Sequence, residues 1–569
     1  MNSIGLLRRG AHRTLTLCMV FALGSLLPLL TLAGPSGSMH GDWEARARCS
    51  TGQTAPIAVH PYVGMTADFF VDGEHGNDAN AGTAEAPFKT ITHALAAVTA
   101  AEAEPVTIHV AASTYSSSRN GESFPLNMKS WVSLAGEGAA ETVLDAENSS
   151  VAMNISGVQD ARLEGFTITG GNGMNGGGIA CSGSSMTVAN NVITGNTADS
   201  GAGIYCLGGS PVLQDNTIVG NTATGQLGFG GGIFMVRTSP HVIGNTMGEN
   251  EGKKVGCIYV YESSPLIEDN TIASNIATGE AALAGGIYIQ RGSPVISGNL
   301  ITDNAATSGS GLVGGIYVLA GSGSIRDNEI SGNSVSGDDG LAGGIYCFQC
   351  SPTISGNAFL GNSSSAVGAI YCLESSPQIT ENVFNRNSGL VGGICAAVGS
   401  TPVIANNQIA ENDGFGIACF PNSGPTILNN LIVGNRKSYF GASGIWCWGS
   451  TAFISNCTIA SNDGFGIVNY ADQPRVQNCI IWGNGDELWN CAATFCCVKD
   501  PDDYGVGNIH DDPLFVPGPL GNYYLDPASS CIDAGSLSAT DAGLSNYTTQ
   551  ADGSPDTGQV DIGFHYHLY

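Results

Sequence analysis

Short apolar runs alternate with polar turns in a unit that recurs along most of the chain. In this unit an isoleucine follows glycine, and twelve or thirteen residues later comes Asn-x-(Ile/Phe/Met)-x-x-Asn. Twelve units follow one another between about residue 176 and residue 484, at intervals of 22 to 29 residues. Such a period predicts a solenoid of stacked, similar coils. The first asparagine of the unit is Asn191, Asn216, Asn245, Asn270, Asn299, Asn328, Asn357, Asn382, Asn407 and Asn430, and cysteine replaces it at Cys457 and Cys479.

Each unit contains three strand signals. In one unit they are centred on Ile287, on Ile296 after a proline, and on Ile301 within the asparagine box. Three strands and three turns in about 25 residues are typical of one coil of a parallel β-helix, and the usual handedness of parallel crossovers favours a right-handed coil. We therefore predict an all-β fold: a single right-handed parallel β-helix solenoid with three strands per coil.

The two ends of this solenoid need caps, because an open sheet edge invites association. Residues 88–103 have apolar side chains at helical spacing, namely Phe88, Ile91, Leu95 and Val98, which predict a helical N-terminal cap. The irregular sequence after residue 490 predicts an irregular C-terminal cap. The expected divisions of the chain are a signal peptide at 1–34, a linker at 35–65, the N-terminal cap and first coils at 66–170, regular β-helix repeats at 171–490 and a C-terminal capping domain at 491–569.

Asparagines and insertions occupy separate places in the unit. Asn304 and its equivalents sit at turns, and repeated at one position they are expected to hydrogen-bond from coil to coil. All variation in length falls between the asparagine box and the next Gly-Ile, in segments such as "ATGEAALAGG". Stacked, these insertions should form a ridge of loops along one side, and insertions of this kind often mark a binding face.

The residue after the isoleucine should point outward, because alternate residues of a strand face opposite sides. It is aromatic in seven consecutive units, and the next outward position is often apolar or aromatic too. One hypothesis is a groove in which the rings stack on sugars, edged by Arg237, Glu262 and Arg291. The competing hypothesis is aromatic stacking that stiffens the solenoid under its own loops. The aromatic strip comprises Tyr205, Phe234, Tyr259, Tyr288, Tyr317, Tyr346, Tyr371 and Trp446, with Leu207, Tyr261, Leu319, Phe348, Leu373, Phe420, Trp448 and Tyr470 at the next outward position.

Composition and charge narrow the choice of partners. Glycine is abundant at 81 residues, and only 12% of residues are charged. Arg8, Arg9 and Arg13 precede an apolar run, which predicts a cleaved secretory signal, with a transmembrane anchor as the alternative. Cleavage would remove three arginines and no acid, leaving 16 basic against 48 acidic residues, a charge of −32. We expect a secreted or cell-surface protein with no integral membrane segment after cleavage and no nucleic-acid partner.

Cysteines mostly follow the repeat. Six of them lie two residues after the isoleucine and should point inward as small apolar side chains. Four others lie outside the repeat and are better candidates for disulfides. The inward six are Cys181, Cys206, Cys347, Cys372, Cys419 and Cys447, and the other four are Cys491, Cys496, Cys497 and Cys531.

Three stretches resemble known families. "FFVDGEHGNDANAGTAEAPFKTITHAL" is similar to the N-terminal motif shared by secreted right-handed β-helix proteins, among them a domain of unknown function and the family-nine pectate lyases. The repeats resemble those of pectin-lyase-like proteins. The stretch "GNIHDDPLFVPGPLGNYYLDPASSCIDAG" resembles the end domain of bacterial surface β-helix proteins. These resemblances imply a right-handed β-helix fold and export from the cell, and they indicate little about activity.

Catalytic machinery is not evident in the sequence. A lyase of this class needs an Arg or Lys base beside an acidic calcium cluster, and no spacing links the two here. Asp338-Asp339 lies in an insertion without the His and Arg-Lys motifs of a glycosidase, and Asp72 and Asp78 look like turn residues. Whether the chain is an enzyme therefore stays open, and so does calcium as a cofactor.

The leading hypothesis is binding of extracellular polysaccharide along the aromatic strip beside the loop ridge. The alternatives are a polysaccharide lyase or glycosidase and a non-enzymatic structural or adhesive surface protein. The predicted carbohydrate-binding residues are Tyr259, Tyr288, Tyr317, Tyr346, Tyr371, Phe348, Arg237, Arg291 and Glu262.

Overall fold

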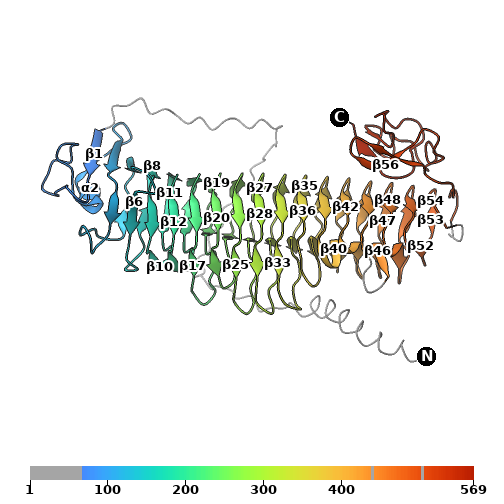
Figure 1. Cartoon of the computed structure of the whole chain (residues 1–569), viewed down its shortest axis with the longest axis horizontal. Helices are drawn as coiled ribbons and strands as arrows, with labels where there is room; N and C mark the ends of the chain where they lie inside the picture. Colours follow the sequence, from blue (N-terminus) through green and yellow to red (C-terminus); the bar gives the residue numbers. More distant parts are fainter. Residues whose placement is uncertain (1–66, 437–440, 501–504, 569) are drawn as a thin grey trace, which may run out of the picture. The chain divides into compact units, whose positions relative to one another are not determined.

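The computed structural model describes residues 67–436, 441–500 and 505–568. They form a parallel β-solenoid whose coils stack along one axis (Figure 1). The predicted signal peptide and linker lie outside the described residues. Among the described residues, no helix has the length and apolar character needed to cross a membrane.

Three columns of parallel strands make up the wall of the solenoid, as predicted. The first column carries the Gly-Ile strands, and the long strand β11 joins it to the second. Its members are β4 (Leu126–Asn127), β7 (Met153–Ser156), β11 (Ile179–Ala189), β14 (Ile204–Gly209), β18 (Ile233–Val236), β22 (Ile258–Tyr261), β26 (Ile287–Gln290), β30 (Ile316–Leu319), β34 (Ile345–Phe348), β37 (Ile370–Leu373), β40 (Ser388–Ala397), β43 (Asp413–Cys419), β46 (Ala442–Cys447), β49 (Phe465–Asn469) and β52 (Asp486–Trp489).

The second column carries the strand that follows the serine-proline turn, and it begins earlier in the chain. Its members besides β11 are β1 (Ala67–Val71), β2 (Val106–Val110), β5 (Val132–Gly136), β8 (Gln159–Glu164), β15 (Val212–Gln214), β19 (His241–Ile243), β23 (Leu266–Glu268), β27 (Val295–Ser297), β31 (Ser324–Arg326), β35 (Thr353–Ser355), β38 (Gln378–Thr380), β41 (Val403–Ala405), β44 (Thr426–Leu428), β47 (Phe453–Ser455), β50 (Arg475–Gln477) and β53 (Ala493–Thr494).

The third column carries the strand inside the asparagine box and has 16 members in one sheet. They are β3 (Ser113–Tyr115), β6 (Thr142–Asp145), β9 (Thr167–Thr169), β12 (Val192–Thr194), β16 (Thr217–Val219), β20 (Thr246–Gly248), β24 (Thr271–Ala273), β28 (Leu300–Thr302), β32 (Glu329–Ser331), β36 (Ala358–Leu360), β39 (Val383–Asn385), β42 (Gln408–Ala410), β45 (Leu431–Val433), β48 (Thr458–Ala460), β51 (Ile480–Trp482) and β54 (Cys497–Val498).

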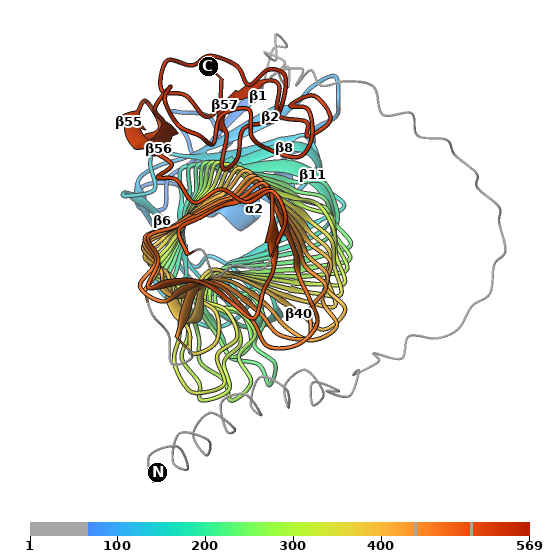
Figure 2. The same ribbon diagram turned by 90° about the vertical axis from the view of Figure 1, so that its right-hand side faces the viewer.

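A short fourth strand, which the sequence did not predict, begins the insertions of the earlier coils. These strands form a separate seven-stranded sheet that ends at β33. Viewed along the axis, the insertions project together from one side of the stack (Figure 2). The seven strands are β10 (Asn172–Asn175), β13 (Thr197–Ser200), β17 (Thr222–Ala223), β21 (Glu251–Gly252), β25 (Ile276–Ala277), β29 (Ala305–Ala306) and β33 (Ser334–Val335).

The core is the inside of the coils. Ile287, Ile296 and Ile301, the three strand centres of one coil, are fully buried, and their equivalents in other coils join the same core cluster. The six inward cysteines of the repeat are in this cluster as well, so their predicted apolar role is confirmed.

Two asparagine ladders bind each coil to the next. The predicted one is confirmed, since Asn304 Oδ1 accepts hydrogen bonds from the backbone N–H and the Nδ2 of Asn275 at 3.1 and 2.9 Å, and a second ladder runs through Asn299. The side-chain oxygen of Asn299 accepts hydrogen bonds from both the backbone N–H and the Nδ2 of Asn270, each at 2.9 Å. Its own Nδ2 donates to Asn328 and to the carbonyls of Ile267 and Ser297. Every polar atom of this buried amide therefore has a partner, as buried polar groups require.

Thiols continue the first ladder where asparagine stops. The backbone N–H of Asn430 points at Cys457 Sγ at 3.4 Å, that of Cys457 at Cys479 Sγ, and that of Cys479 at Cys496 Sγ at 3.2 Å. Cys496 is a free buried thiol, as are Cys491, Cys497 and Cys531. The idea that these four form disulfides is not supported, and Cys496 accepts a ladder hydrogen bond instead.

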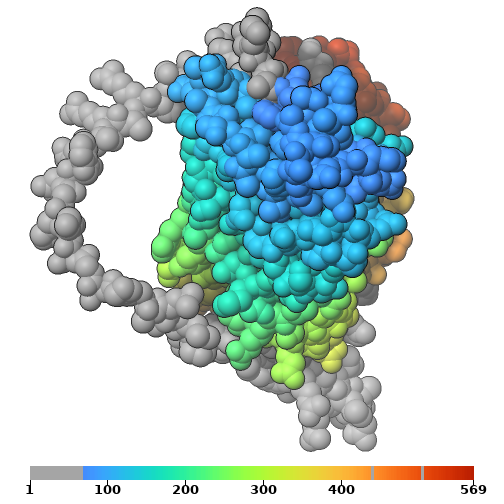
Figure 3. Space-filling view, turned by 90° about the vertical axis from the view of Figure 1, so that its left-hand side faces the viewer, coloured from blue at the N-terminus to red at the C-terminus, as the bar shows by residue number. Residues whose placement is uncertain are grey.

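The N-terminal end is covered by a helix. Helix α2 (Ile91–Ala97) packs on β1 and β4 and is seen through the coils in Figure 2. Phe88, Ile91, Leu95 and Val98 are all buried, although the helix is shorter than the predicted 88–103. The buried carboxylate of Glu122 accepts the N–H groups of Ile91 and Thr92 at its first turn. Residues of the N-terminal part of the chain, blue in Figure 3, form a continuous surface over this end of the solenoid.

The C-terminal segment mostly packs on the flank of the last coils. Ile509 pairs with Cys497 and extends the last coil. The rest contains two antiparallel pairs, of β55 (Phe515–Gly518) with β56 (Gly521–Leu525) and of β57 (Tyr547–Thr548) with β58 (Tyr566–His567). Tyr524, Phe564 and Tyr566 share a cluster with Leu431 and Ala460 of the third column.

We expect Asn299→Leu to destabilise the protein by about 2–5 kcal/mol, because several buried hydrogen-bonding groups would lose their partner at once. Asn299→Cys should cost clearly less, since cysteine already accepts the same N–H at Cys457. Thermal unfolding of both variants checks this. Equal losses would show that the ladder position needs only volume and not an acceptor.

Candidate functional site

The tyrosine column is buried, so of the two hypotheses for the aromatic strip the open groove is wrong for these coils, and the stack covered by its own loops is confirmed. Tyr259, Tyr288, Tyr317, Tyr346 and Tyr371 are only 2–7% exposed. Their rings face away from the core cluster, as the pleat requires, and stack along the axis with centroids 4.9–5.3 Å apart. Facing away from the core therefore did not mean facing solvent.

The insertions explain the burial. Phe229, which lies just before the Gly-Gly that returns the chain to the wall, stacks on Tyr259 with centroids 4.6 Å apart. Val255 pairs with Phe229, and pairing continues from coil to coil through Ala284, Val313 and Ala342, all four of which are fully buried. The returning arm of each insertion thus packs beside the tyrosines. Burial raises the pKa of Tyr288, so the phenol stays neutral.

The surface groove lies one turn further along the chain. We call it the turn groove: a cavity of about 770 Å³ on the outer turn between the first and second columns. Glu262, Arg291, Gln349 and Glu374 line it, so two of the predicted site residues meet there. In the coils that line the groove, the turn residue has φ between 47° and 55°, which sharply reverses the chain after the strand.

Glu262 is held between two arginines from the neighbouring coils. Its carboxylate accepts a hydrogen bond from Arg237 Nε at 2.9 Å and lies 3.7 Å from Arg291 Nη1. The hydrogen bond from Arg237 keeps the pKa of Glu262 below its usual value and raises the pKa of Arg237. Glu262 and Arg237 therefore stay charged at neutral pH, and Arg291 is half exposed toward the groove.

Exposed hydroxyl groups line the groove beside these charges. Ser264, Ser293 and Ser322 occupy the same place in successive coils, and Ser293 and Ser322 hydrogen-bond at 2.7 Å. Gln349 Nε2 donates to Glu374 at 2.8 Å. Sequence reasoning missed these groove residues, although the Ser that follows each turn residue in the repeat was a visible signal.

The half-buried rings of Phe348 and Tyr261 lie at the ends of first-column strands, just before the turns that carry the groove. We call this line of strand ends and turns the turn edge. Phe348 stacks on buried Tyr346 at 6.2 Å, and Tyr261 stacks on Tyr259 at 6.4 Å. Of the predicted binding residues, the structure thus gathers Arg237, Glu262, Arg291 and Phe348 along the turn edge, while the five tyrosines lie beneath it.

The other acidic candidates are occupied or isolated. Asp72 Oδ1 accepts the N–H groups of Glu74 and His75, and Asp78 Oδ1 accepts those of Lys89 and Thr90. Both behave as turn formers, which was the preferred interpretation. Asp338 is exposed on an insertion.

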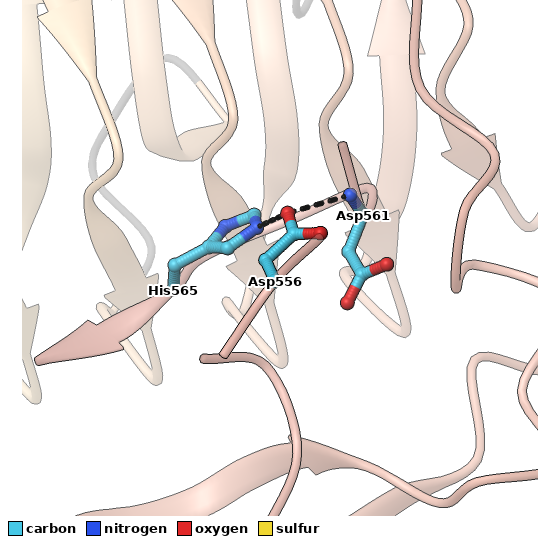
Figure 4. Close-up of side chains that lie close together, drawn as sticks. All are labelled: Asp556, Asp561 and His565. Carbon is cyan, nitrogen blue, oxygen red and sulfur yellow. Dashed lines mark hydrogen bonds and ion pairs between the residues drawn. The ribbon is translucent and has the colours of Figure 1, made fainter. Parts of the chain in front are cut away.

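One buried group in the described residues has metal-type ligands, namely Asp556, Asp561 and His565 (Figure 4). Its atoms are already engaged. Asp556 Oδ2 lies 2.8 Å from His565 Nε2 and accepts the N–H of Asp561, while Asp561 accepts from Asp533 and Thr549. Burial raises the pKa of Asp561. This is a closed polar network that ties the C-terminal segment together.

The same segment is clamped to the solenoid at His565. The backbone N–H of His565 donates to Asn429 Oδ1 at 2.7 Å, and its carbonyl accepts from Asn429 Nδ2 at 2.9 Å. The network therefore fixes a strand that crosses the turns of the last coils.

Comparisons with known proteins agree with this architecture. Residues 74–251 match the model of a protein of unknown function, DUF1565, and residues 314–440 match that of a right-handed β-helix region. Together with the parallel solenoid, these matches make the chain a right-handed β-helix protein. No curated protein matches it.

Three solved structures are similar over much of the chain. A lacto-N-biosidase from Eubacterium ramulus is 11% identical, with 65% of this chain and 64% of that chain covered and a TM-score of 0.29. The A-module of the mannuronan C-5 epimerase AlgE6 from Azotobacter vinelandii is 14% identical, with 74% and 93% covered and a TM-score of 0.27. XylC in complex with xylose is 10% identical, with 80% and 88% covered and a TM-score of 0.29. At these TM-scores the likeness carries no functional argument.

We expect Tyr288→Ala to destabilise the protein by about 3–5 kcal/mol, since it removes a buried ring from a packed stack. Tyr288→Phe keeps the ring and should stay close to the wild type. Thermal unfolding checks both. An alanine variant as stable as the wild type would mean that the ring is not packed in solution.

His565→Ala should lower the free energy of unfolding of the C-terminal segment by about 3–5 kcal/mol, because the buried side chain of Asp556 would lose the imidazole it pairs with. The matched control is His567→Ala, whose side chain is 56% exposed and 3.9 Å from Glu381. Limited proteolysis and hydrogen exchange of residues 515–568 report the difference, and equal protection in the two variants would contradict it.

Proposed function

We propose, for a chain that is a right-handed β-helix protein, that it binds extracellular polysaccharide in the turn groove. The observation that carries the proposal is the lining of this groove, in which hydroxyl, amide, carboxylate and guanidinium groups face solvent over consecutive coils. Such a mixture of donors and acceptors suits sugar hydroxyls. Because the coils repeat about every 4.8 Å, an extended polymer lying along the axis meets similar groups at regular intervals.

Charge supports a binding role for sugars over nucleic acid. The whole chain has a formal charge of −29, which repels polyanions. Glu262 also neutralises part of the basic charge of Arg237 and Arg291. The predicted signal peptide supports a secreted or cell-surface location, where such a polymer is met.

Binding is favoured over hydrolysis by the spacing of the carboxylates. Glu262 and Glu374 are four coils apart, which is about 19 Å at one strand spacing per coil. Paired glycosidase carboxylates lie roughly 5–9.5 Å apart. Among the described residues, the groove therefore lacks a pair of carboxylates at glycosidase spacing. We assign the buried tyrosines beside the groove a structural role in supporting it.

A structural or adhesive role is the second candidate. The observation that favours it is the buried tyrosine stack, which together with the asparagine ladders stiffens the coils. A stiff rod presenting no ligand-binding edge would fit that role.

A glycan array in calcium and in EDTA, followed by titration of the hits, tests the proposal. We expect Arg291→Ala to weaken binding at least tenfold, because it removes a groove donor. The matched control is Arg386→Ala, which breaks a similar pair with Glu411 outside the groove and should bind normally. Sugar release during the titration would indicate an enzyme, and absence of any glycan ligand would favour the structural role.

A further inference from the structure

The aromatic surface that is covered in the middle coils becomes exposed in the last ones. Tyr470 is 45% exposed and Trp489 is 41% exposed, in contrast to the buried tyrosines of the earlier coils. Trp489 pairs with Val468, which pairs with Trp446, so it continues the tyrosine column. Trp448 and Tyr470 continue the column of Phe348.

The long insertions stop before the last coils. The fourth-strand sheet ends at β33. Ile287 lies twelve positions after Asn275, whereas Ile467 lies only five positions after Asn462. A short connection can still cover a ring, since Phe415, which lies three residues after Asn412, is buried and stacks on Trp446 with centroids 5.0 Å apart. In the last coils, however, Tyr470 and Trp489 remain open.

These rings form a supported pair. The centroids of Tyr470 and Trp489 are 4.7 Å apart, close to one strand spacing. Buried Trp446 supports Tyr470, with its ring edge-on to Tyr470 at 6.1 Å and stacked with Trp448 at 6.2 Å, and Tyr470 in turn contacts Trp489. Rings fixed in this way lose little conformational entropy when a ligand binds.

The size of the pair suits a sugar better than a protein. An aromatic side chain buries roughly 150–250 Å², so the exposed parts of two rings amount to on the order of 200 Å². A stable protein interface needs about 1,200 Å² or more. One or two pyranose rings, whose C–H faces pack on aromatic faces, would cover this patch.

Local charge selects a neutral ligand. Asp472 and Asp486 are both exposed and lie close in sequence to the two rings. Arg475 is not available to offset them here, because it stacks over Phe453 of the second column at 5.1 Å. An acidic polymer would therefore be repelled, while a neutral one would not.

We propose that Tyr470 and Trp489 form a second carbohydrate site, which stacks the apolar faces of neutral hexose or pentose residues. This deepens the proposed function and rests on it. Strand register carries the column from Phe348 through Leu373, Ala397, Phe420 and Trp448 to Tyr470. Five coils, or about 24 Å, separate its ends, so one extended chain reaches both the turn groove and the ring pair.

Titration of the full chain with neutral gluco-, manno- and xylo-oligosaccharides, and with an oligogalacturonate, tests this inference. We expect binding of at least one neutral series and not of the acidic one. Tyr470→Ala and Trp489→Ala should each weaken it about tenfold, whereas Trp489→Phe keeps an aromatic face and should remain within about threefold. The control is Phe495→Ala, which removes another exposed ring near the same end.

Two readouts separate this inference from the proposed function. Ligand should change the tryptophan fluorescence of the wild type, and Trp489→Phe should reduce that change while binding persists. If Arg291→Ala weakens binding and both ring variants bind normally, the turn groove stands and the ring pair is overturned. If only the acidic oligosaccharide binds, the neutral specificity is wrong.

Discussion

The structure depends on hydrogen bonds that repeat from each coil to the next. Each asparagine of the ladder satisfies the backbone and side chain of its predecessor and is satisfied by its successor. A chain this rich in glycine and turns gains little from local propensity, so the register must come from such contacts. Because a buried amide left without its partner is costly, the distance from strand to ladder hardly varies along the chain.

This constraint restricts variation in the length of the repeat to one place. Insertions are tolerated only after the second asparagine, where they leave both ladders intact, and there they decide what solvent can reach. Long insertions return over the tyrosine column and turn it into a second packed layer. In the last coils, which have no long insertions, the same face is open at Tyr470 and Trp489. One repeat therefore provides both a rigid support and an accessible surface, depending on the loops that follow the asparagine box.

The two surfaces along the turn edge differ in chemistry and share a direction. The turn groove offers charged and hydroxyl groups around Glu262 and Arg291, while the ring pair offers apolar faces. Both belong to columns that run along the solenoid axis, and a linear ligand can follow that axis. The C-terminal segment lies away from this edge, on the third column, where His565 clamps it to Asn429.

The sequence by itself determined the fold, because a period of Gly-Ile strands and asparagine boxes leaves one way to bury the isoleucines and pair the amides. It also predicted the inward cysteines and the place of the insertions, and it named Arg237, Glu262 and Arg291 as edge residues. Only the tertiary structure decided that Tyr288 and its neighbours are buried. Strand alternation tells which side of the wall a residue faces, but what packs against that side is contributed by loops whose path has no period. For the same reason the closed network of Asp556, Asp561 and His565, and its clamp on Asn429 more than 100 residues earlier, could not be predicted from spacing.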